Sequence, residues 1–287
     1  MSKAIKKLLI REANVAFNSI LAGIAIGIGC TVNLMLSRTK VPGAEKTEEF
    51  MFLAKVFGSI FFGLGLFSVI KFKMWLFTGK VGFIIDNIKK KEWIFFLDLL
   101  LCFIFNCVGI GLFSWIVKLS RNGDGLQAAA AGVVAKKRNP NDPEPGDPDY
   151  LSTFILSMMC GFMIYIAVRG HGTTEGDFTK DTFIFFAVCV FILSGFEHCI
   201  SNFSYFVYAD IQPKDWFLTI FMGIGNMVGS VILDFLIQMG VKFTKMVEDE
   251  KKNAEENKAS QLLDKPEDEQ EEKKDESNDE VDLPKNM

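Results

Sequence analysis

The sequence predicts an all-α membrane protein with six membrane-spanning helices, arranged as two inverted repeats of three, with the second and fifth helices broken. Three observations lead to this fold class: long apolar runs, a short motif that recurs in the third and sixth of them, and polar interruptions near the second and fifth. The composition points the same way, because 49% of the 287 residues are hydrophobic and 29 are Phe.

The apolar runs are long enough to cross a bilayer, which takes about 20 residues in a helix. Six such runs can be read from the sequence, together with two shorter apolar pieces. The runs are 16–36, 52–70, 93–117, 151–168, 182–196 and 216–240, and the pieces are 74–88 and 200–209. We therefore expect a pore domain over 16–245, with the two repeats at about 16–117 and 151–240.

The segments outside the pore domain indicate the orientation. Residues 1–15 place basic side chains around apolar ones, which predicts an amphipathic helix on the cytoplasmic face. Basic residues follow the second, fourth and sixth runs, as at cytoplasmic ends. Both termini are therefore expected in the cytoplasm and the protein in the plasma membrane. The segment 118–150 is expected to be an outer loop, although it carries basic residues.

The composition changes abruptly near residue 246. From there on the chain is rich in Glu, Asp, Lys, Asn and Ser and has almost no aromatic residues. Such a segment has too few apolar side chains to build a core. The sequence predicts a disordered acidic cytoplasmic tail over 246–287.

The internal repeat is indicated by the motif Asn-x-Val-Gly, which begins at Asn106 in the third run and at Asn226 in the sixth. Counting back 28 residues from each Asn leads to Thr78 and to His198. The spacing predicts that these two polar residues are equivalent in the repeats. With three spans in each half, the halves must insert in opposite directions, as the inverted repeats of transporters do.

A pore is indicated by Glu197 and His198, which stand within an otherwise apolar stretch. Ionisable groups at membrane depth are costly and normally face a bundle interior or an aqueous path. The breaks predicted at 76–79 and 195–198 fit this view, since unwound backbone is tolerated there only where it is buried in protein or lines a cavity. A half-helix that restarts after a break also directs free N–H groups at that cavity, which favours an anion.

Three motifs, in this order, resemble the signatures of the formate/nitrite transporter family. They are Leu76-Phe-Thr-Gly79, Gly195-Phe-Glu-His-Cys-Ile-Ser-Asn202 and Gly225-Asn-Met-Val-Gly229, and the stretch from Leu21 to Gly29 is similar to the family's first span. The resemblance covers about residues 10–245. It implies an aquaporin-like protomer that assembles as a homopentamer with one pore per subunit. It also implies passage of small monovalent anions such as formate, nitrite, acetate, lactate or hydrosulfide, commonly with a proton.

The resemblance further implies roles for individual residues. His198 is expected to be the central pore histidine, with Glu197 beside it and Thr78 facing it from the other broken helix. Asn106 and Asn226 are expected to brace this site. Two apolar constrictions are expected to enclose the histidine, an outer one at Phe62 and Phe191 and an inner one at Leu66, Leu76 and Phe77. The candidates for a basic charge in the vestibule are Lys136 and Lys137.

A histidine between apolar constrictions suits the transport of an anion together with a proton. An ordinary imidazole gains and loses a proton near neutral pH. Apolar rings exclude water, so a bare carboxylate would meet a large desolvation cost there, whereas the neutral acid would not. We expect the anion to take a proton on its way to His198 or beside it. Gly161, which stands where the family often has Asn, is expected to widen the pore and to favour acetate or lactate beside formate.

Two other classes of function remain as alternatives. A neutral-solute channel of the aquaporin type would carry paired Asn-Pro-Ala motifs, which this sequence lacks. An intramembrane enzyme would need more than Glu197 and His198, because the predicted spans hold no second His, no His-Glu-x-x-His metal motif and no clear nucleophile. A scaffold would have no use for broken helices. We expect no enzyme activity, no metal or cofactor and no nucleic acid; the expected partners are small anions, protons and the lipid bilayer.

Overall fold

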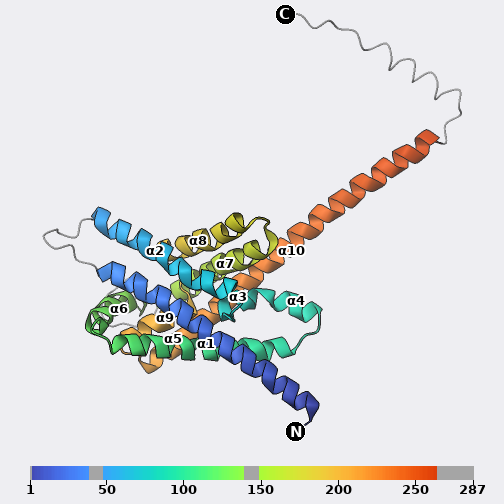
Figure 1. Ribbon diagram of the computed structural model, residues 1–287. Coiled ribbons are helices and arrows are strands. Elements are labelled where there is room, and N and C mark those ends of the chain that lie inside the picture. The colour runs from blue at the N-terminus through green and yellow to red at the C-terminus, as the bar shows by residue number, and fades with distance from the viewer. Residues whose placement is uncertain (1, 39–47, 139–148, 264–287) are drawn as a thin grey trace, which may run out of the picture. The chain divides into compact units, whose positions relative to one another are not determined.

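The protein's structure, a computed structural model, describes residues 2–38, 48–138 and 149–263. Within these ranges all regular structure is helical (Figure 1), so the predicted all-α class is confirmed. The helices are α1 (Lys3–Arg38), α2 (Glu48–Lys71), α3 (Phe77–Lys80), a 3-10 turn (Val81–Phe83), α4 (Ile84–Lys89), α5 (Ile94–Lys118), α6 (Gly123–Arg138), α7 (Tyr150–Thr173), α8 (Asp177–Leu193), α9 (Cys199–Tyr208) and α10 (Pro213–Leu263). The described residues up to Phe235 form one compact unit, and those from Leu236 to Leu263 belong to another.

Five of the described helices are long and apolar enough to cross a membrane, namely α1, α2, α5, α7 and α10. Helix α8, on which the fifth predicted span falls, has 17 residues. At 1.5 Å per residue it is about 26 Å long, which is shorter than the roughly 30 Å hydrocarbon core. A complete crossing there needs the residues of α9 as well.

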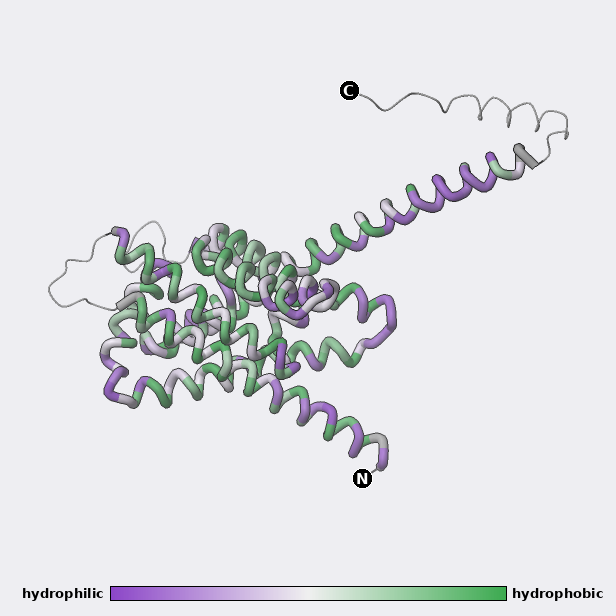
Figure 2. The backbone as a smooth tube through the Cα atoms, turned by 45° about the horizontal axis from the view of Figure 1, so that its top comes forward, coloured by the Kyte–Doolittle hydropathy of each residue, from purple (hydrophilic) through white to green (hydrophobic). Residues whose placement is uncertain are grey.

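The compact unit buries polar side chains and exposes apolar ones, as expected of a protein surrounded by lipid. On α5, for example, Leu100, Ile104 and Val108 are exposed, whereas Asp98 and Asn106 are buried. Figure 2 shows hydrophobic colour along the helices of this unit and mostly hydrophilic colour over the last turns of α10.

Glycines allow two pairs of helices to pack closely. A Cβ at Gly23 of α1 would overlap the carbonyl oxygen of Asn106 on α5, and a Cβ at Gly161 of α7 would overlap that of Asn226 on α10. Small residues at such crossings are how membrane helices approach without voids. Gly161 therefore serves a helix contact, and the expectation that it widens the pore is wrong.

Three segments differ from their predicted form. The predicted N-terminal helix over 1–15 is part of α1, because no Gly or Pro interrupts the chain from Lys3 to Ala22. The predicted loop over 118–150 contains α6, whose four successive alanines at 128–131 are strong helix formers. The expectation of disorder from residue 246 is corrected as well, since α10 continues to Leu263.

The extension of α10 has a local cause. Residues 241–263 include no Gly or Pro, and Lys252 pairs with Glu256 one turn later, with 3.8 Å between Nζ and Oε1. Such pairs stabilise an exposed helix. The remaining part of the predicted tail, 264–287, lies outside the described residues.

Candidate functional site

Two helical segments of the compact unit are interrupted and then restart. Helix α2 ends at Lys71 and α3 begins at Phe77, while α8 ends at Leu193 and α9 begins at Cys199. The backbone groups in both gaps need partners, since unpaired N–H and C=O groups are expensive away from water.

One asparagine supplies these partners in the first gap. The side-chain oxygen of Asn106 accepts a hydrogen bond from the N–H of Phe77 at 2.8 Å. Its amide nitrogen donates to the carbonyl oxygens of Trp75 and Ser19, both at 2.8 Å. Asn106 therefore joins α1, the gap and the first residue of α3.

Asn226 makes the same set of bonds in the second gap. Its side-chain oxygen accepts from the N–H of Cys199 at 3.0 Å, and its nitrogen donates to the carbonyl oxygens of Glu197 and Ser157, both at 2.8 Å. In both networks the asparagine binds the first residue of the restarted helix, the residue two places before it and a serine on an earlier long helix.

The two matching asparagine networks show that Thr78 and His198 are not the equivalent positions of the repeats that the sequence spacing predicted. His198 and Leu76 occupy the same position before a restarted helix and have similar backbone angles, with φ of −101° and −109°. Thr78 therefore corresponds to Ile200, and not to His198. The count of 28 residues failed because the distance along the chain from the first helical residue to the asparagine is 29 residues in one half and 27 in the other.

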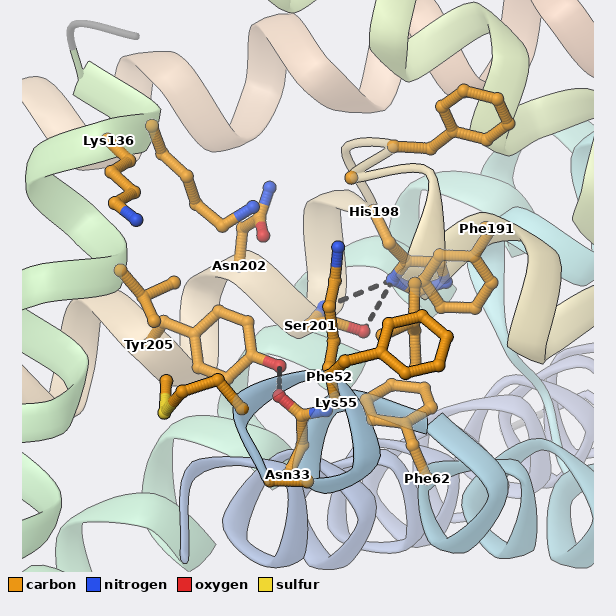
Figure 3. Close-up of a pocket in the computed structure, with 17 residues that line it drawn as sticks. Asn33, Phe52, Lys55, Phe62, Lys136, Phe191, His198, Ser201, Asn202 and Tyr205 are labelled. Carbon is orange, nitrogen blue, oxygen red and sulfur yellow. Dashed lines mark hydrogen bonds between the residues drawn. The ribbon is translucent and has the colours of Figure 1, made fainter. Parts of the chain in front are cut away.

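Thr78 and His198 nevertheless meet. The Oγ1 atom of Thr78 lies 2.9 Å from Nε2 of His198, and both side chains are buried. The other ring nitrogen, Nδ1, accepts the backbone N–H of Ser201 at 3.1 Å (Figure 3). Because that N–H can only donate, we assign the hydrogen of the neutral ring to Nε2, from where it is donated to Thr78.

The carboxylate of Glu197 has other partners than this pair. Its Oε2 atom accepts hydrogen bonds from Nζ of Lys137 at 2.6 Å and from the side-chain amide of Asn202. The carboxylate is thus neutralised by a lysine of α6 directly beside the gap. Lys136, the other vestibule candidate, has no ion-pair partner within the described part of the chain.

A cavity of about 470 Å³ reaches this region from one side (Figure 3). Phe62 and Phe191 line it, with their ring centroids 5.7 Å apart in an edge-to-face arrangement. The ring of His198 lies 5.9 Å from that of Phe191. Three lysines line the same cavity, Lys55, Lys136 and Lys137, whereas no Asp or Glu of the described residues does.

A second cavity, of about 340 Å³, is lined by Leu66 and Leu76. Leu66 lies four residues after Phe62 on α2, so the two lining residues are about 6 Å apart along the helix axis. Phe77, expected at the inner constriction, lines neither cavity, and its ring packs against Phe103 of α5 at 5.0 Å between centroids. Leu76 has extended backbone angles and precedes the first residue of α3, so successive side chains there point in different directions and Phe77 packs toward α5 while Leu76 lines the cavity.

Four polar residues that complete these networks were not expected from the sequence as site residues: Ser19, Ser157, Ser201 and Asn202. The place of Ser201 three residues after His198 was an available signal, because the side chain that caps the start of a helix accepts a hydrogen bond from the N–H two or three positions on. Nothing in the local sequence around Ser19 on α1 or Ser157 on α7 indicates that their carbonyl oxygens accept bonds from Asn106 and Asn226.

Comparison with known proteins agrees with this architecture. The family model of the formate/nitrite transporters matches residues 1–240. No curated protein matches the chain significantly.

Solved structures of similar fold are found. One, described as a pentameric formate channel with formate bound, is 22% identical with a TM-score of 0.64, over 81% of this chain and 98% of that one. Another, described as an FNT family ion channel, is 19% identical with a TM-score of 0.63, over 84% of this chain and 99% of that one. The chain therefore belongs to the formate/nitrite transporter family and is an integral membrane transport protein rather than an enzyme.

Proposed function

We propose that this chain is a proton-linked channel or transporter for small monovalent anions such as formate, lactate and acetate, with nitrite as a further candidate. The observation that carries the proposal is the buried hydrogen bond between Thr78 and His198, 2.9 Å long, at the restarted helices where two cavities approach each other. In this proposal the two cavities are the two mouths of one path.

The barrier between the mouths is short and apolar. Phe62 and Phe191 close the outer cavity, and Leu66 and Leu76 close the inner one, each with 4% of its surface exposed or less. A charged carboxylate would lose its hydration between these side chains, at a cost of several kcal/mol. The uncharged acid has only two oxygen atoms that need hydrogen-bond partners, and Thr78 and His198 can supply hydrogen bonds to them.

Basic side chains supply the first attraction. The ammonium groups of Lys55 and Lys136 lie at the outer cavity, as Figure 3 shows, and Lys55 donates to the carbonyl oxygen of Leu193 at 2.8 Å. We propose that Lys136 attracts the anion, because Lys137 is engaged by Glu197. The anion takes its proton from a hydronium ion in the vestibule, which is left as water, and the neutral acid then passes His198.

We further propose a homopentamer with one pore in each subunit. One of the similar structures is described as pentameric, and α5 presents exposed apolar side chains that suit lipid or a neighbouring subunit. We also propose that the two repeats insert in opposite directions and that both termini lie in the cytoplasm, because basic residues follow alternate spans. We propose the plasma membrane as the location.

The test is uptake of labelled formate and lactate into liposomes that contain the purified protein, with and without an inward proton gradient. We expect saturable uptake that the gradient stimulates, and a change in its rate and pH dependence in His198→Ala. The control is Thr173→Ala, an exposed residue at the end of α7 that lines neither cavity.

Two results would contradict the proposal. Formate uptake by folded protein that stays the same from about pH 8 to about pH 5 would exclude proton linkage, since the weak acid becomes more abundant as pH falls. Passage of uncharged solutes such as glycerol, without passage of any monovalent anion, would favour a neutral-solute channel.

A further inference from the structure

Helices α1 and α5 run in the same direction with a fixed register. Arg11 of α1 binds Asp98 of α5, and the carbonyl oxygen of Ser19 accepts a hydrogen bond from Asn106, so both contacts join residues 87 positions apart. With this constant offset, the residues before Arg11 lie at the level of the turn between α4 and α5. Figure 1 shows the first turns of α1 and this turn at the same end of the compact unit.

This end of the compact unit carries an excess of positive charge. Its exposed lysines, here called the lysine cluster, are Lys3, Lys6 and Lys7 on α1 and Lys89, Lys90 and Lys91 at the end of α4. Two acidic side chains of the same segments are paired with arginines, Glu12 with Arg11 at 2.7 Å and Asp86 with Arg169 at 3.5 Å. Glu92 is the remaining acid of these segments. Within the described chain, Lys90 and Lys91 have no carboxylate at ion-pair distance.

The backbone holds Lys90 and Lys91 in a defined turn. The N–H of Glu92 donates to the carbonyl oxygen of Asn87 at 2.9 Å, and that of Lys91 to Ile88 at 3.0 Å, which is the Schellman ending of a helix. Lys91 has the left-handed φ of 59° that this ending requires. Glycine is the usual residue there, because a Cβ is strained at such a φ. A lysine at this position adds charge to the cluster at the expense of local backbone stability.

A stripe of exposed apolar side chains leads away from the lysine cluster along α5. Its members recur every three or four residues, so they share one face of the helix, and each is between 41% and 63% exposed; they are Trp93, Leu97, Leu100, Ile104 and Val108. The last two line a third cavity, of about 310 Å³, together with Trp216 and Ile220 of α10.

The length of this stripe matches one leaflet of a bilayer. From Ile94, the first residue of α5, to Ile104 is ten residues, or about 15 Å along the helix axis. This is half of the roughly 30 Å hydrocarbon core. Trp93, at the start of the stripe, is 63% exposed, and tryptophan is enriched at the level of lipid headgroups.

We propose that this surface is a binding site for an anionic phospholipid. The headgroup is held by the lysine cluster, chiefly by Lys7, Lys90 and Lys91, and one acyl chain lies along the stripe and ends in the third cavity. Lysines at the membrane surface attract such headgroups. A free phosphate or carboxylate would use the lysines but would leave the apolar stripe without a role. The site is separate from both cavities of the proposed pore, and the inference does not depend on the transported substrate.

The test is the preference of the protein for phosphatidylserine over phosphatidylcholine. It is measured in vesicles by quenching of tryptophan fluorescence with lipids brominated at mid-chain. Trp115→Phe serves as the parent protein, because its remaining exposed tryptophans, Trp93 and Trp216, then lie along the site. We expect the parent to prefer phosphatidylserine about three- to tenfold, and Lys90→Gln with Lys91→Gln to abolish most of this preference.

Two further variants separate the charge of the cluster from other effects. Lys251→Gln with Lys258→Gln removes the same charge from exposed positions of α10 and should keep the parent's preference. Lys91→Gly should lower the preference about two- to threefold, while its melting temperature in a zwitterionic detergent should equal or exceed that of the parent, because glycine adopts a left-handed φ without strain.

Three results would overturn the proposal. One is equal binding of the two lipids by the parent protein, and another is an undiminished preference in Lys90→Gln with Lys91→Gln. The third is competition by glycerophosphoserine, the headgroup without its chains, as strong as that by the intact lipid, which would show that the lysines bind any small anion. If a neighbouring subunit covers the stripe instead of lipid, the brominated chains quench neither exposed tryptophan, and the lipid site is excluded.

Discussion

Thr78 and His198, which belong to two different broken helices, are joined by a buried hydrogen bond of 2.9 Å between Oγ1 and Nε2. The bond links residues 120 positions apart and has a defined direction, because the N–H of Ser201 occupies the other ring nitrogen. In the proposed path, a donor of fixed direction between the two apolar barriers would recognise the oxygen of a passing acid.

We predict that Thr78→Val slows formate transport by about tenfold or more, while Thr78→Ser keeps most of it. Valine has a similar shape but leaves the Nε2 hydrogen of His198 without its acceptor in a buried place. The measurement is initial uptake in liposomes at equal protein content. Equal loss of rate in both variants would show that the hydroxyl group is not what matters.

We predict that Glu197→Gln destabilises the folded protein by about 3 kcal/mol, because it leaves the charge of Lys137 unpaired in a largely buried place. The double variant Glu197→Gln with Lys137→Met should recover part of this loss, since no unpaired charge remains. Thermal unfolding in detergent measures both. A double variant less stable than the single one would contradict the assigned pairing.

We predict that Asn106→Leu destabilises the protein by several kcal/mol, because it leaves the Phe77 N–H and two carbonyl groups without their partners. Asn106→Asp keeps the acceptor for Phe77 but loses both donated bonds, so it should also be destabilising. Thermal unfolding followed by tryptophan fluorescence would check this. Asn226→Leu should have an effect of similar size, because its bonds are the same in kind.

We predict that Gly161→Ala lowers stability by about 2 kcal/mol or more, because the added methyl group would overlap the backbone of Asn226. Gly132→Ala on α6 is the control, since a Cβ there meets nothing within 4 Å, and it should be neutral or stabilising by up to about 1 kcal/mol. The measurement is the melting temperature of each variant compared with that of the wild-type protein. A stable Gly161→Ala protein with altered choice between formate and lactate would instead place Gly161 at the pore.

The sequence by itself determined the membrane class, the family, and the residues around which the site is built. Long apolar runs, the ionisable pair at Glu197 and the Asn-x-Val-Gly motifs are local patterns, and the physical cost of polar groups in lipid makes them readable without coordinates. The extent of α10 was misjudged because polar composition alone does not reveal the absence of helix-breaking residues.

Only the tertiary structure decided which residues meet. The pairing of Lys137 with Glu197, the turn of Phe77 toward α5, the correspondence of His198 with Leu76 and the role of Gly161 all depend on how separate helices pack. The same holds for the inner cavity, whose lining residues Lys80 and His171 come from α3 and α7. Sequence periodicity reports which face of a helix is apolar, but the rotation and crossing of one helix against another are set by contacts between distant residues.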